Sequence, residues 1–355
     1  MSAAIDRYAP DLLAWFDTHG RHDLPWQHPR TPYRVWLSEI MLQQTQVATV
    51  IGYFDRFVDA LPDLPALAAA PQERVLALWS GLGYYARARN LHAAARLCVE
   101  RHDGDLPRDL DALVALPGIG RSTAAAILSQ AWGDRHAILD GNVKRVLARY
   151  HGIDGWPGAP RVEKQLWALA DAHASSPDLP DARLPDYTQA QMDLGATLCT
   201  RARPTCLLCP LRGACVAHRD GRTDDLPTPR PGKTLPQREA DVLWLEDARG
   251  RILLQQRPQT GIWAALWTLP QAEDRDAADA WRDTHVHAPG DGEPLPPIAH
   301  AFSHYRLTLH PRRWRAVAPR DDVGDNDTLR WVPSDALDTL GIPAPIRKLL
   351  SRAGE

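Results

Sequence analysis

A cluster of cysteines constrains the fold of this chain more than any other feature of its sequence. Four of the five cysteines lie in one short stretch with the spacing C-x6-C-x2-C-x5-C, namely Cys199, Cys206, Cys209 and Cys215. Four soft ligands at this spacing can hold one metal centre, and a tetrathiolate site suits either a zinc ion or an iron–sulfur cluster. The spacing alone leaves both open. The stretch predicts a loop that is pinned by a metal centre.

Length and composition set further bounds. The 355 residues allow two or three domains, and the net charge of −3 excludes a uniformly basic nucleic-acid coat but not local basic patches. Neither a cationic leader nor an apolar run of about 18 residues is found, so we expect a cytoplasmic protein that contacts no membrane. Thiols stay reduced in that compartment, which favours metal ligation over disulfides. Cys98 lies among alanines and leucines in a helical stretch and is expected in the core.

The character of the sequence changes along the chain. Residues 1–219 read as successive amphipathic helices, one of which is expected to begin at Thr31–Pro32 and to continue to Val58. Residues 220–237 are rich in proline and polar side chains, as in a linker. Residues 238–355 alternate short apolar runs with turns, including a hairpin around D-A-R-G, and end in a helical P-I-R-K-L-L. The sequence predicts an all-α domain, a linker, and a domain of mixed α and β structure.

Two stretches of the helical half are suited to holding phosphate. The cysteine loop carries no acid and four arginines: Arg201, Arg203, Arg212 and Arg219. The segment L-P-G-I-G places Gly118 and Gly120 between two helices, where backbone N–H groups and a helix dipole attract an anion. A solvated surface and a plain helix–helix turn are the alternatives. The next helix is expected to carry three cations on its polar side: Lys144, Arg145 and Arg149.

Two carboxylates in the same half are candidates for chemistry. Glu39 has Val35, Trp36 and Leu42 three or four positions away, and burial on such an apolar face raises the pKa of a glutamate toward neutrality. A half-exposed glutamate at the edge of that face is the alternative. Asp140 stands at a helix start, where capping is the default role. An acid of raised pKa paired with an ionised aspartate can break a glycosidic bond through a cationic sugar.

Together these segments resemble a known family. L-P-G-I-G, L-D-G-N-V and the cysteine spacing are similar to helix-hairpin-helix DNA glycosylases that carry a [4Fe–4S] cluster. W-L-S-E-I-M-L-Q-Q-T-Q-V and G-L-G-Y-Y-A-R-A-R-N-L are similar to the MutY family of adenine DNA glycosylases, and the resemblance covers nearly the whole chain. It implies an α-helical N-terminal glycosylase domain, with a helix-hairpin-helix and an iron–sulfur cluster loop, and an α+β Nudix-like C-terminal domain.

The resemblance also implies the activity and its partners. The expected reaction is the removal, in base-excision repair, of adenine mispaired with 8-oxoguanine or guanine in double-stranded DNA. Acid-assisted hydrolysis of the N-glycosidic bond is the expected chemistry, and adenine must first be flipped out of the duplex. The expected cofactor is a [4Fe–4S] cluster, and the expected protein is a bacterial-type, nucleoid-associated monomer.

Residue roles follow from the same resemblance. The expected catalytic residues are the acid Glu39, Asp140 as the stabiliser of the sugar cation, and Asn142. The expected adenine pocket comprises Leu24, Trp26 and Gln189. The residues expected to wedge into the duplex are Gln44 and Tyr84. The expected contacts to the DNA backbone are Gly118, Gly120, Ser122, Lys144, Arg201 and Arg203. The loop expected to inspect the base opposite adenine is Phe302, Ser303 and His304, for which a plain β-strand is the simpler interpretation without the resemblance.

The sequence also departs from the family. The C-terminal half lacks the glutamate-rich R-E-x-x-E-E helix, so a nucleotide pyrophosphatase is not expected. His22 stands where a more strongly basic side chain is expected. A bifunctional pyrimidine glycosylase/lyase of the endonuclease-III type needs a Schiff-base lysine where this chain has Ser122, although Lys144 could occasionally trap an abasic product. A non-catalytic iron–sulfur DNA-binding protein is the other alternative.

Overall fold

The protein is described here by a computed structural model that covers residues 7–232, 234–320 and 328–351. Its chain divides into two compact units. The helical unit comprises residues 1–68 and 93–232, and the sheet unit comprises residues 69–92 and 233–355. Residues 69–92 thus group with the C-terminal part, and the domain limits of 1–219, 220–237 and 238–355 stay a prediction. Within the described ranges, no helix is long and apolar enough to cross a membrane.

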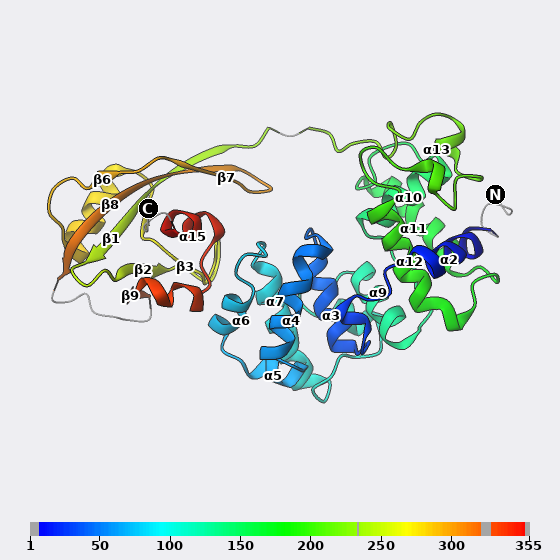
Figure 1. The fold of residues 1–355 in the computed structure, drawn as a ribbon, viewed down its shortest axis with the longest axis horizontal. Helices are drawn as coiled ribbons and strands as arrows, with labels where there is room; N and C mark the ends of the chain where they lie inside the picture. The colour runs from blue at the N-terminus through cyan, green and yellow to red at the C-terminus, as the bar shows by residue number, and fades with distance from the viewer. Residues whose placement is uncertain (1–6, 233, 321–327, 352–355) are drawn as a thin grey trace. The chain divides into compact units, whose positions relative to one another are not determined.

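The helical unit is built from α-helices and short 3-10 turns (Figure 1). Its helices are α2 (Tyr8–His19), α3 (Pro32–Leu42), α4 (Val47–Ala60), α5 (Leu64–Ala69), α8 (Leu110–Val114), α9 (Arg121–Trp132), α10 (Gly141–His151), α11 (Pro160–Ala174), α12 (Leu184–Thr197) and α13 (Val216–Arg219). The 3-10 turns are η1 (Pro25–Gln27), η2 (Asp181–Arg183) and η3 (Cys206–Leu208). Helix α6 (Gln72–Leu78) lies in the sheet unit, and α7 (Ala86–Arg101) runs from that unit into the helical one.

The start of α3 confirms the predicted cap, whereas its end corrects the prediction. The Thr31 side chain accepts a hydrogen bond from the Arg34 N–H, and Pro32 occupies the first turn. The helix does not continue to Val58, because Gln44 adopts a left-handed backbone with φ 58°. The chain therefore turns between α3 and α4, and this turn projects polar side chains that a continuous helix would have placed along its length.

Helix α10 packs against α11, α12 and α13 of the helical unit. Its apolar side packs against α12, with Val143, Val146 and Leu147 buried in one core with Leu194. Helix α3 packs on α9, and α9 packs on α12. Because α9 and α10 follow one another in the chain and both contact α12, the loop between them is fixed on either side. Asp140 ends that loop.

The sheet unit carries the mixed α and β structure that the sequence predicts. Its strands are β1 (Gln237–Asp247), β2 (Ile252–Gln256), β3 (Trp267–Thr268), β4 (Gln271–Ala272), β5 (Val286–His287), β6 (Glu293–Pro294), β7 (Ile298–Ala301), β8 (Arg306–Pro319) and β9 (Leu329–Val332). The remaining elements are α14 (Arg275–His285), η4 (Ser334–Thr339) and α15 (Ala344–Ser351). The predicted hairpin around D-A-R-G is confirmed, since β1 and β2 pair antiparallel with Glu246 opposite Ile252.

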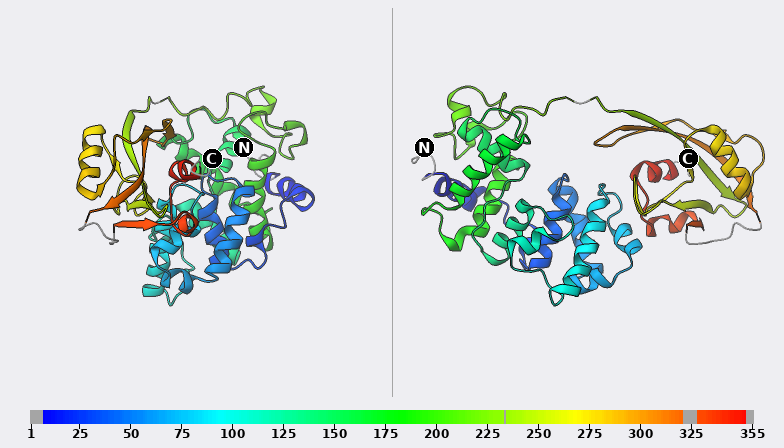
Figure 2. Two further views of the ribbon diagram at one scale, coloured as in Figure 1. Left: turned by 60° about the vertical axis from the view of Figure 1, so that its left-hand side comes forward. Right: turned by 180° about the vertical axis from the view of Figure 1, so that it is seen from behind.

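The two long strands β1 and β8 run parallel and form the middle of the sheet, in the order β3-β2-β1-β8-β5. Strand β7 pairs with β8 as an antiparallel hairpin, and β9 pairs with β2. Helix α14 packs against β1 and β4, and the views agree that the long strands lie between α14 and α15 (Figure 2). The helical C-terminus predicted from P-I-R-K-L-L is confirmed as α15.

Candidate active site and cysteine pocket

A cleft of about 1140 Å³ lies in the helical unit. It is larger than the roughly 300–1,000 Å³ of a typical small-molecule pocket, and it is lined by polar and apolar side chains together. The lining includes Arg21, Leu24, Trp26, Glu39, Gln44, Ser122, Asp140, Asn142, Arg145, Gln189 and Arg201. Residues that the sequence assigns to catalysis, to the adenine pocket and to DNA contact therefore share one cleft.

Glu39 reaches this cleft from α3, between the buried side chains of Ser38 and Ile40. Gln130 on α9 donates a hydrogen bond of 2.8 Å from Nε2 to Glu39 Oε1. The pKa of Glu39 is raised to about 7, chiefly by burial and also by the nearby charge of Asp140, while the hydrogen bond from Gln130 opposes the rise. A carboxyl group of this pKa carries a proton for much of the time at neutral pH.

Asp140 caps α10, as the sequence predicts for its default role. Its Oδ1 accepts a 2.8 Å hydrogen bond from the Val143 N–H, and Asn142 Nδ2 stands 3.4 Å from Oδ2. Burial raises the pKa of Asp140 as well, but these donors oppose the rise. The helix N-terminus also favours a negative charge there. Of the two carboxyl groups, Asp140 is thus the one equipped to hold the charge and Glu39 the one equipped to hold the proton.

The predicted adenine-pocket residues also line the cleft, and two charged residues that the sequence analysis missed hold one of them. Gln189 is buried on α12, and its Nε2 donates a 2.7 Å hydrogen bond to Oδ1 of Asp193 one turn further on. Asp193 is itself fixed by Arg21, whose backbone N–H and guanidinium both donate to it. The Q-x-x-x-D spacing was the available signal for this pair.

A close approach between helices sets the position of Asn142. A Cβ atom built on Gly195 of α12 would lie 2.5 Å from the Cβ of Asn142 on α10. Arg145 completes this corner, because its Nη2 donates to Asn142 Oδ1 and to the Gly195 carbonyl, both at 2.8 Å. The same guanidinium donates from Nε to the Cys199 carbonyl at 2.7 Å. Arg145 therefore joins the cleft to the cysteine loop.

Both predicted wedge residues have strained backbones. Gln44 in the helical unit and Tyr84 in the sheet unit have φ of 58° and 48°, a region that residues other than glycine rarely adopt. Both side chains are exposed, and Tyr84 is 53% exposed although tyrosine is usually largely buried. Arg87 holds the Tyr84 turn by donating to the carbonyls of Leu82 and Gly83.

The residues expected to contact the DNA backbone differ in the contacts that they already make within the protein. Gly118 has φ 81°, which the tight turn between α8 and α9 requires, and Gly120 caps α9. The Ser122 hydroxyl accepts the Leu139 N–H at 2.9 Å inside the cleft. Lys144 pairs with Glu163 at 2.6 Å, and the cleft lining within the described residues does not include it.

Three further placements bear on DNA contact. Arg201 lines the cleft, and Arg203 is exposed with φ 55°. His22 packs on Phe16 and bonds to its carbonyl oxygen at 2.9 Å through Nε2. The expectation that Arg149 faces phosphate from the polar side of its helix is wrong. This side chain is 2% exposed and points into the protein.

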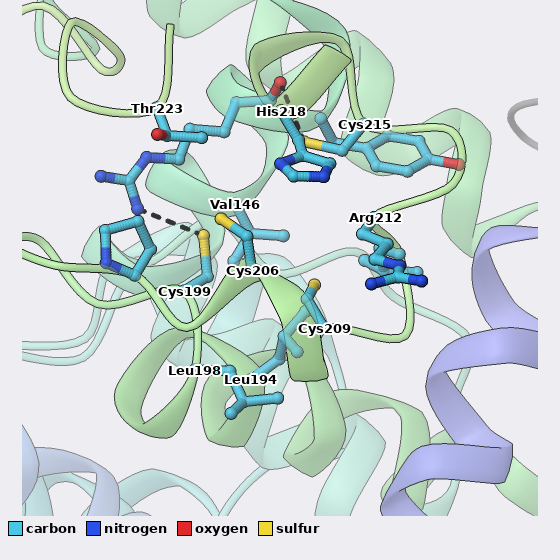
Figure 3. Close-up of a pocket in the computed structure, with 14 residues that line it drawn as sticks. Val146, Leu194, Leu198, Cys199, Cys206, Cys209, Arg212, Cys215, His218 and Thr223 are labelled. Carbon is cyan, nitrogen blue, oxygen red and sulfur yellow. Dashed lines mark hydrogen bonds between the residues drawn. The ribbon is translucent and has the colours of Figure 1, made fainter. Parts of the chain in front are cut away.

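All four clustered cysteines line one pocket (Figure 3), to which the C-terminal half of α10 also contributes side chains. Its remaining walls are mostly apolar and include Val146, Leu194, Leu198 and Leu211. Arg149 Nη1 stands 3.4 Å from Cys199 Sγ, and Cys215 Sγ stands 3.6 Å from the Arg149 carbonyl oxygen. Among the residues that the structure describes, no three histidine, cysteine or acidic side chains converge on the position of a single metal ion. The thiols instead spread around the walls of the pocket.

The predicted reading loop forms the tip of the β7–β8 hairpin rather than a strand interior. The Phe302 N–H donates to the Tyr305 carbonyl at 2.9 Å and closes the turn. The Phe302 ring packs on Tyr305 and Trp263, with centroids 4.8 and 5.7 Å apart. Ser303 and His304 are exposed at the tip.

A helical hairpin beside a cleft that pairs two carboxyl groups, followed by a cysteine-lined pocket, defines a helix-hairpin-helix protein of base excision repair. Residues 37–172 match the model of the HhH-GPD superfamily of base excision DNA repair proteins, and residues 241–352 match that of the NUDIX domain. The chain belongs to the adenine DNA glycosylase family. The predicted fold class and the predicted class of enzyme are both confirmed.

Relatives span nearly the whole chain. It is 34% identical to the adenine DNA glycosylase of Buchnera aphidicola subsp. Acyrthosiphon pisum (strain APS) over 96% of this chain and 95% of that protein. It is 35% identical to the adenine DNA glycosylase of Homo sapiens over 98% of this chain and 74% of that protein. A solved thermostable thymine-DNA glycosylase is similar over 62% of this chain and 98% of its own, with 27% identity and a TM-score of 0.55.

Proposed function

We propose that this enzyme removes adenine paired with 8-oxoguanine or guanine in double-stranded DNA by acid-assisted hydrolysis of the N-glycosidic bond. The observation that carries the proposal is the pairing, in one cleft, of a carboxyl group with a pKa of about 7 and a second one held by donors at a helix N-terminus. These are the acid and the anion that such a reaction needs.

In this mechanism Glu39 donates its proton to a ring nitrogen of adenine. The bond between the base and the sugar then breaks, and its electron pair leaves with the now neutral base. The sugar carries the positive charge, which Asp140 stabilises across the cleft. Water adds to the sugar carbon and loses a proton, which restores the acid. Asn142 and Arg145 hold the geometry of Asp140, and Gln189, fixed by Asp193, leaves its amide oxygen to accept from the adenine amino group.

The adenine must leave the duplex to reach this cleft, at a cost of a few kcal/mol. Gln44 and Tyr84 suit the filling of the gap, because both are exposed on turns whose left-handed backbone holds the side chain outward. Gly118 and Gly120 suit the contact with the phosphates through N–H groups at the start of α9, and Arg201 and Arg203 suit it through charge.

A [4Fe–4S] cluster fits the cysteine pocket better than zinc does. The ligand set is all sulfur, which suits both, but four thiols of a single zinc must stand about 3.8 Å apart because each Zn–S bond is about 2.3 Å. Thiols spread around pocket walls suit a larger group. Cys199, Cys206, Cys209 and Cys215 would hold the cluster, whose role here is to pin the loop that carries Arg201. We place the enzyme on the nucleoid, in the cytoplasm, as a monomer.

The base opposite adenine is read, in this proposal, by the β7–β8 tip. 8-Oxoguanine offers N7 as a donor where guanine offers an acceptor, so its reader needs an acceptor such as the Ser303 hydroxyl. His304 adds a hydrogen bond, and Phe302 anchors the turn through its packing on Tyr305 and Trp263. One such bond supplies about 1–3 kcal/mol of discrimination.

Single-turnover excision from duplexes with A·8-oxoguanine and A·G pairs tests this function. We expect adenine release without strand cleavage, faster from the oxidised pair. In the double variant Ser303→Ala, His304→Ala the preference for the oxidised pair should shrink about tenfold, with release from A·G retained. The control is Ser334→Ala, His287→Ala, which removes the same side chains from exposed positions of the same unit. An unchanged preference rejects the reading loop, and rapid strand cleavage would favour a lyase.

A further inference from the structure

The chain segment that carries one of the two proposed wedge residues belongs to the sheet unit. This segment, residues 69–92, is separated in sequence from the rest of that unit but packs with it. The Glu73 carboxylate accepts a hydrogen bond from Trp267 Nε1 at 2.8 Å. Near the other end of the segment, Arg89 Nη1 donates to the Ala264 carbonyl at 2.9 Å. The sheet unit therefore holds the segment on both sides of the exposed turn in its middle.

That turn, residues 80–85, is poorly suited to keep one conformation by itself, and we call it the wedge turn. Three of its residues have a positive φ: 105° at Gly81, 72° at Gly83 and 48° at Tyr84. Ordering a glycine costs more conformational freedom than ordering any other residue, and a tyrosine at such a φ is strained. The Tyr84 side chain is exposed and cannot fix the turn by packing. The turn therefore needs support from neighbouring groups.

A single carbonyl group of the sheet unit, that of Ile342, binds both ends of the wedge turn. The Ser80 hydroxyl donates to it at 3.2 Å, and the Tyr85 hydroxyl donates to it at 3.1 Å. A carbonyl oxygen can accept both bonds because it has two lone pairs. The Tyr85 hydroxyl also accepts the Gly81 N–H at 3.4 Å. Tyr85 is buried, so water competes little for these bonds.

The Ile342 carbonyl is itself held in place by its surroundings. The Ile342 side chain is 1% exposed. Arg347 on α15 donates through Nη2 to the Leu340 carbonyl at 3.0 Å and to the Ser80 hydroxyl at 3.2 Å. One guanidinium thus binds the wedge turn and the chain just before Ile342, which its planar set of donors makes possible. The acceptor for Ser80 and Tyr85 is therefore fixed in the sheet unit.

We propose that Tyr85 is a positioning residue that, together with Ser80, uses the Ile342 carbonyl to hold Tyr84 in the conformation that fills the gap left by a flipped adenine. This inference rests on the proposed function for the role of Tyr84. It gives the sheet unit a second task beside the reading of 8-oxoguanine. The gap is the same whichever base stands opposite, so this support acts equally on A·8-oxoguanine and A·G pairs. The reading tip, in contrast, acts on the ratio between the two.

The test uses the full-length enzyme and the double variant Ser80→Ala, Tyr85→Phe, which removes both donors to the Ile342 carbonyl and keeps Tyr84. Single-turnover excision should fall about tenfold from both pairs, with their ratio unchanged. A duplex with 2-aminopurine in place of the adenine, which fluoresces more strongly when unstacked, should show a smaller rise on binding. In the background of Tyr84→Ala the same double substitution should cause no further loss, because the side chain that it positions is gone.

Two further variants separate positioning from folding. Tyr85→Phe alone keeps the Ser80 bond and should slow excision only about threefold. The matched control is Tyr33→Phe, Ser176→Ala, which removes the same two hydroxyls from buried positions of the helical unit. We expect this control to excise adenine and to raise 2-aminopurine fluorescence as the wild type does.

Several results would overturn the proposal. Wild-type excision and fluorescence in the double variant would show that the turn keeps its conformation without these bonds. An equal loss with and without Tyr84 would mean that the bonds serve only the fold, and a loss confined to A·8-oxoguanine would assign them to reading. If Tyr84→Ala alone extrudes 2-aminopurine as the wild type does, the proposed wedge function fails instead. Hydrogen exchange then decides on the support alone, and exchange at the wild-type rate across residues 80–85 in the double variant overturns it.

Discussion

Helix α10 contributes to both the cleft and the cysteine pocket, but the polar groups of the two regions differ in how fully they are hydrogen-bonded. At its N-terminus, α10 presents Asp140 to a cleft where Glu39 accepts a hydrogen bond from Gln130 and has a pKa of about 7. Further along, Arg145 and Arg149 saturate the carbonyls of the cysteine loop with donors. A carboxyl group with few hydrogen-bond donors keeps a raised pKa and can transfer a proton. Carbonyl groups that accept several hydrogen bonds hold their chain segment rigid. One helix therefore supports a reactive site and a rigid one.

The largest expected effect separates the two regions completely. Glu39→Gln keeps the shape of the side chain but cannot donate the proton, so single-turnover excision should fall by about 10²–10⁴-fold. Binding of the mispair and the visible absorbance of the proposed cluster should match wild type. Glu163→Gln, which removes only the partner of Lys144, serves as the control. If Glu39→Gln excises adenine at a rate within a few-fold of wild type, Glu39 is not the acid of this reaction.

The second prediction concerns pH and again distinguishes the regions. Glu39 acts only when protonated, and its raised pKa keeps the proton in place up to about pH 7. Above that pH the protonated fraction falls tenfold per unit, so excision should be about a hundredfold slower at pH 9 than on the plateau below the pKa. Iron content and DNA binding, measured over the same range, should vary far less. A midpoint near the ordinary glutamate value of 4.5 would contradict the burial argument.

The comparison also shows where the sequence was sufficient. The caps at Thr31 and Asp140 were predictable because N-caps act over three residues, and the β1–β2 hairpin because its turn is local. The roles of Arg149 could not be predicted, since its helical position is polar while its partners, Thr200 and Leu226, lie far along the chain. The only sign in the sequence of the buried pair of Gln189 and Asp193 was the four-residue spacing between them.

The turn at Gln44 shows a different limit. The apolar spacing of Ile40, Val47, Ile51 and Phe54 continues through this turn as if one helix were present. The spacing of apolar side chains does not reveal that one residue has a φ of 58°, because the same apolar spacing continues after that residue. Strain at such a position is tolerated when the surrounding fold determines it.

The third prediction concerns Arg145, which belongs to both regions. Arg145→Gln loses charge-assisted bonds to Asn142, Gly195 and Cys199, each worth about 1.5–3 kcal/mol at most. Excision should fall roughly ten- to a hundredfold, because the Asn142 side chain loses its holder. Exchange protection at residues 199–201 should fall as well. Arg7→Gln, which breaks an exposed pair with Asp11, is the control. A loss confined to one region would mean that α10 serves the two sites independently.

The smallest expected effect belongs to Arg201, the cysteine-loop residue that lines the cleft. Arg201→Ala removes one of the proposed phosphate contacts and leaves Glu39, Asp140 and the thiols in place. The slope of log K against log salt should become shallower by about 0.9, and affinity should drop several-fold for damaged and undamaged duplexes alike. The excision rate at saturating enzyme should stay within about twofold of wild type, since a backbone contact positions DNA without taking part in bond cleavage. Fluorescence anisotropy at four salt concentrations measures the slope, with Arg108→Ala, which loses an exposed pair with Asp134, as the control. If affinity falls for the mispair alone and the salt slope is unchanged, Arg201 contacts the base and not the phosphate backbone.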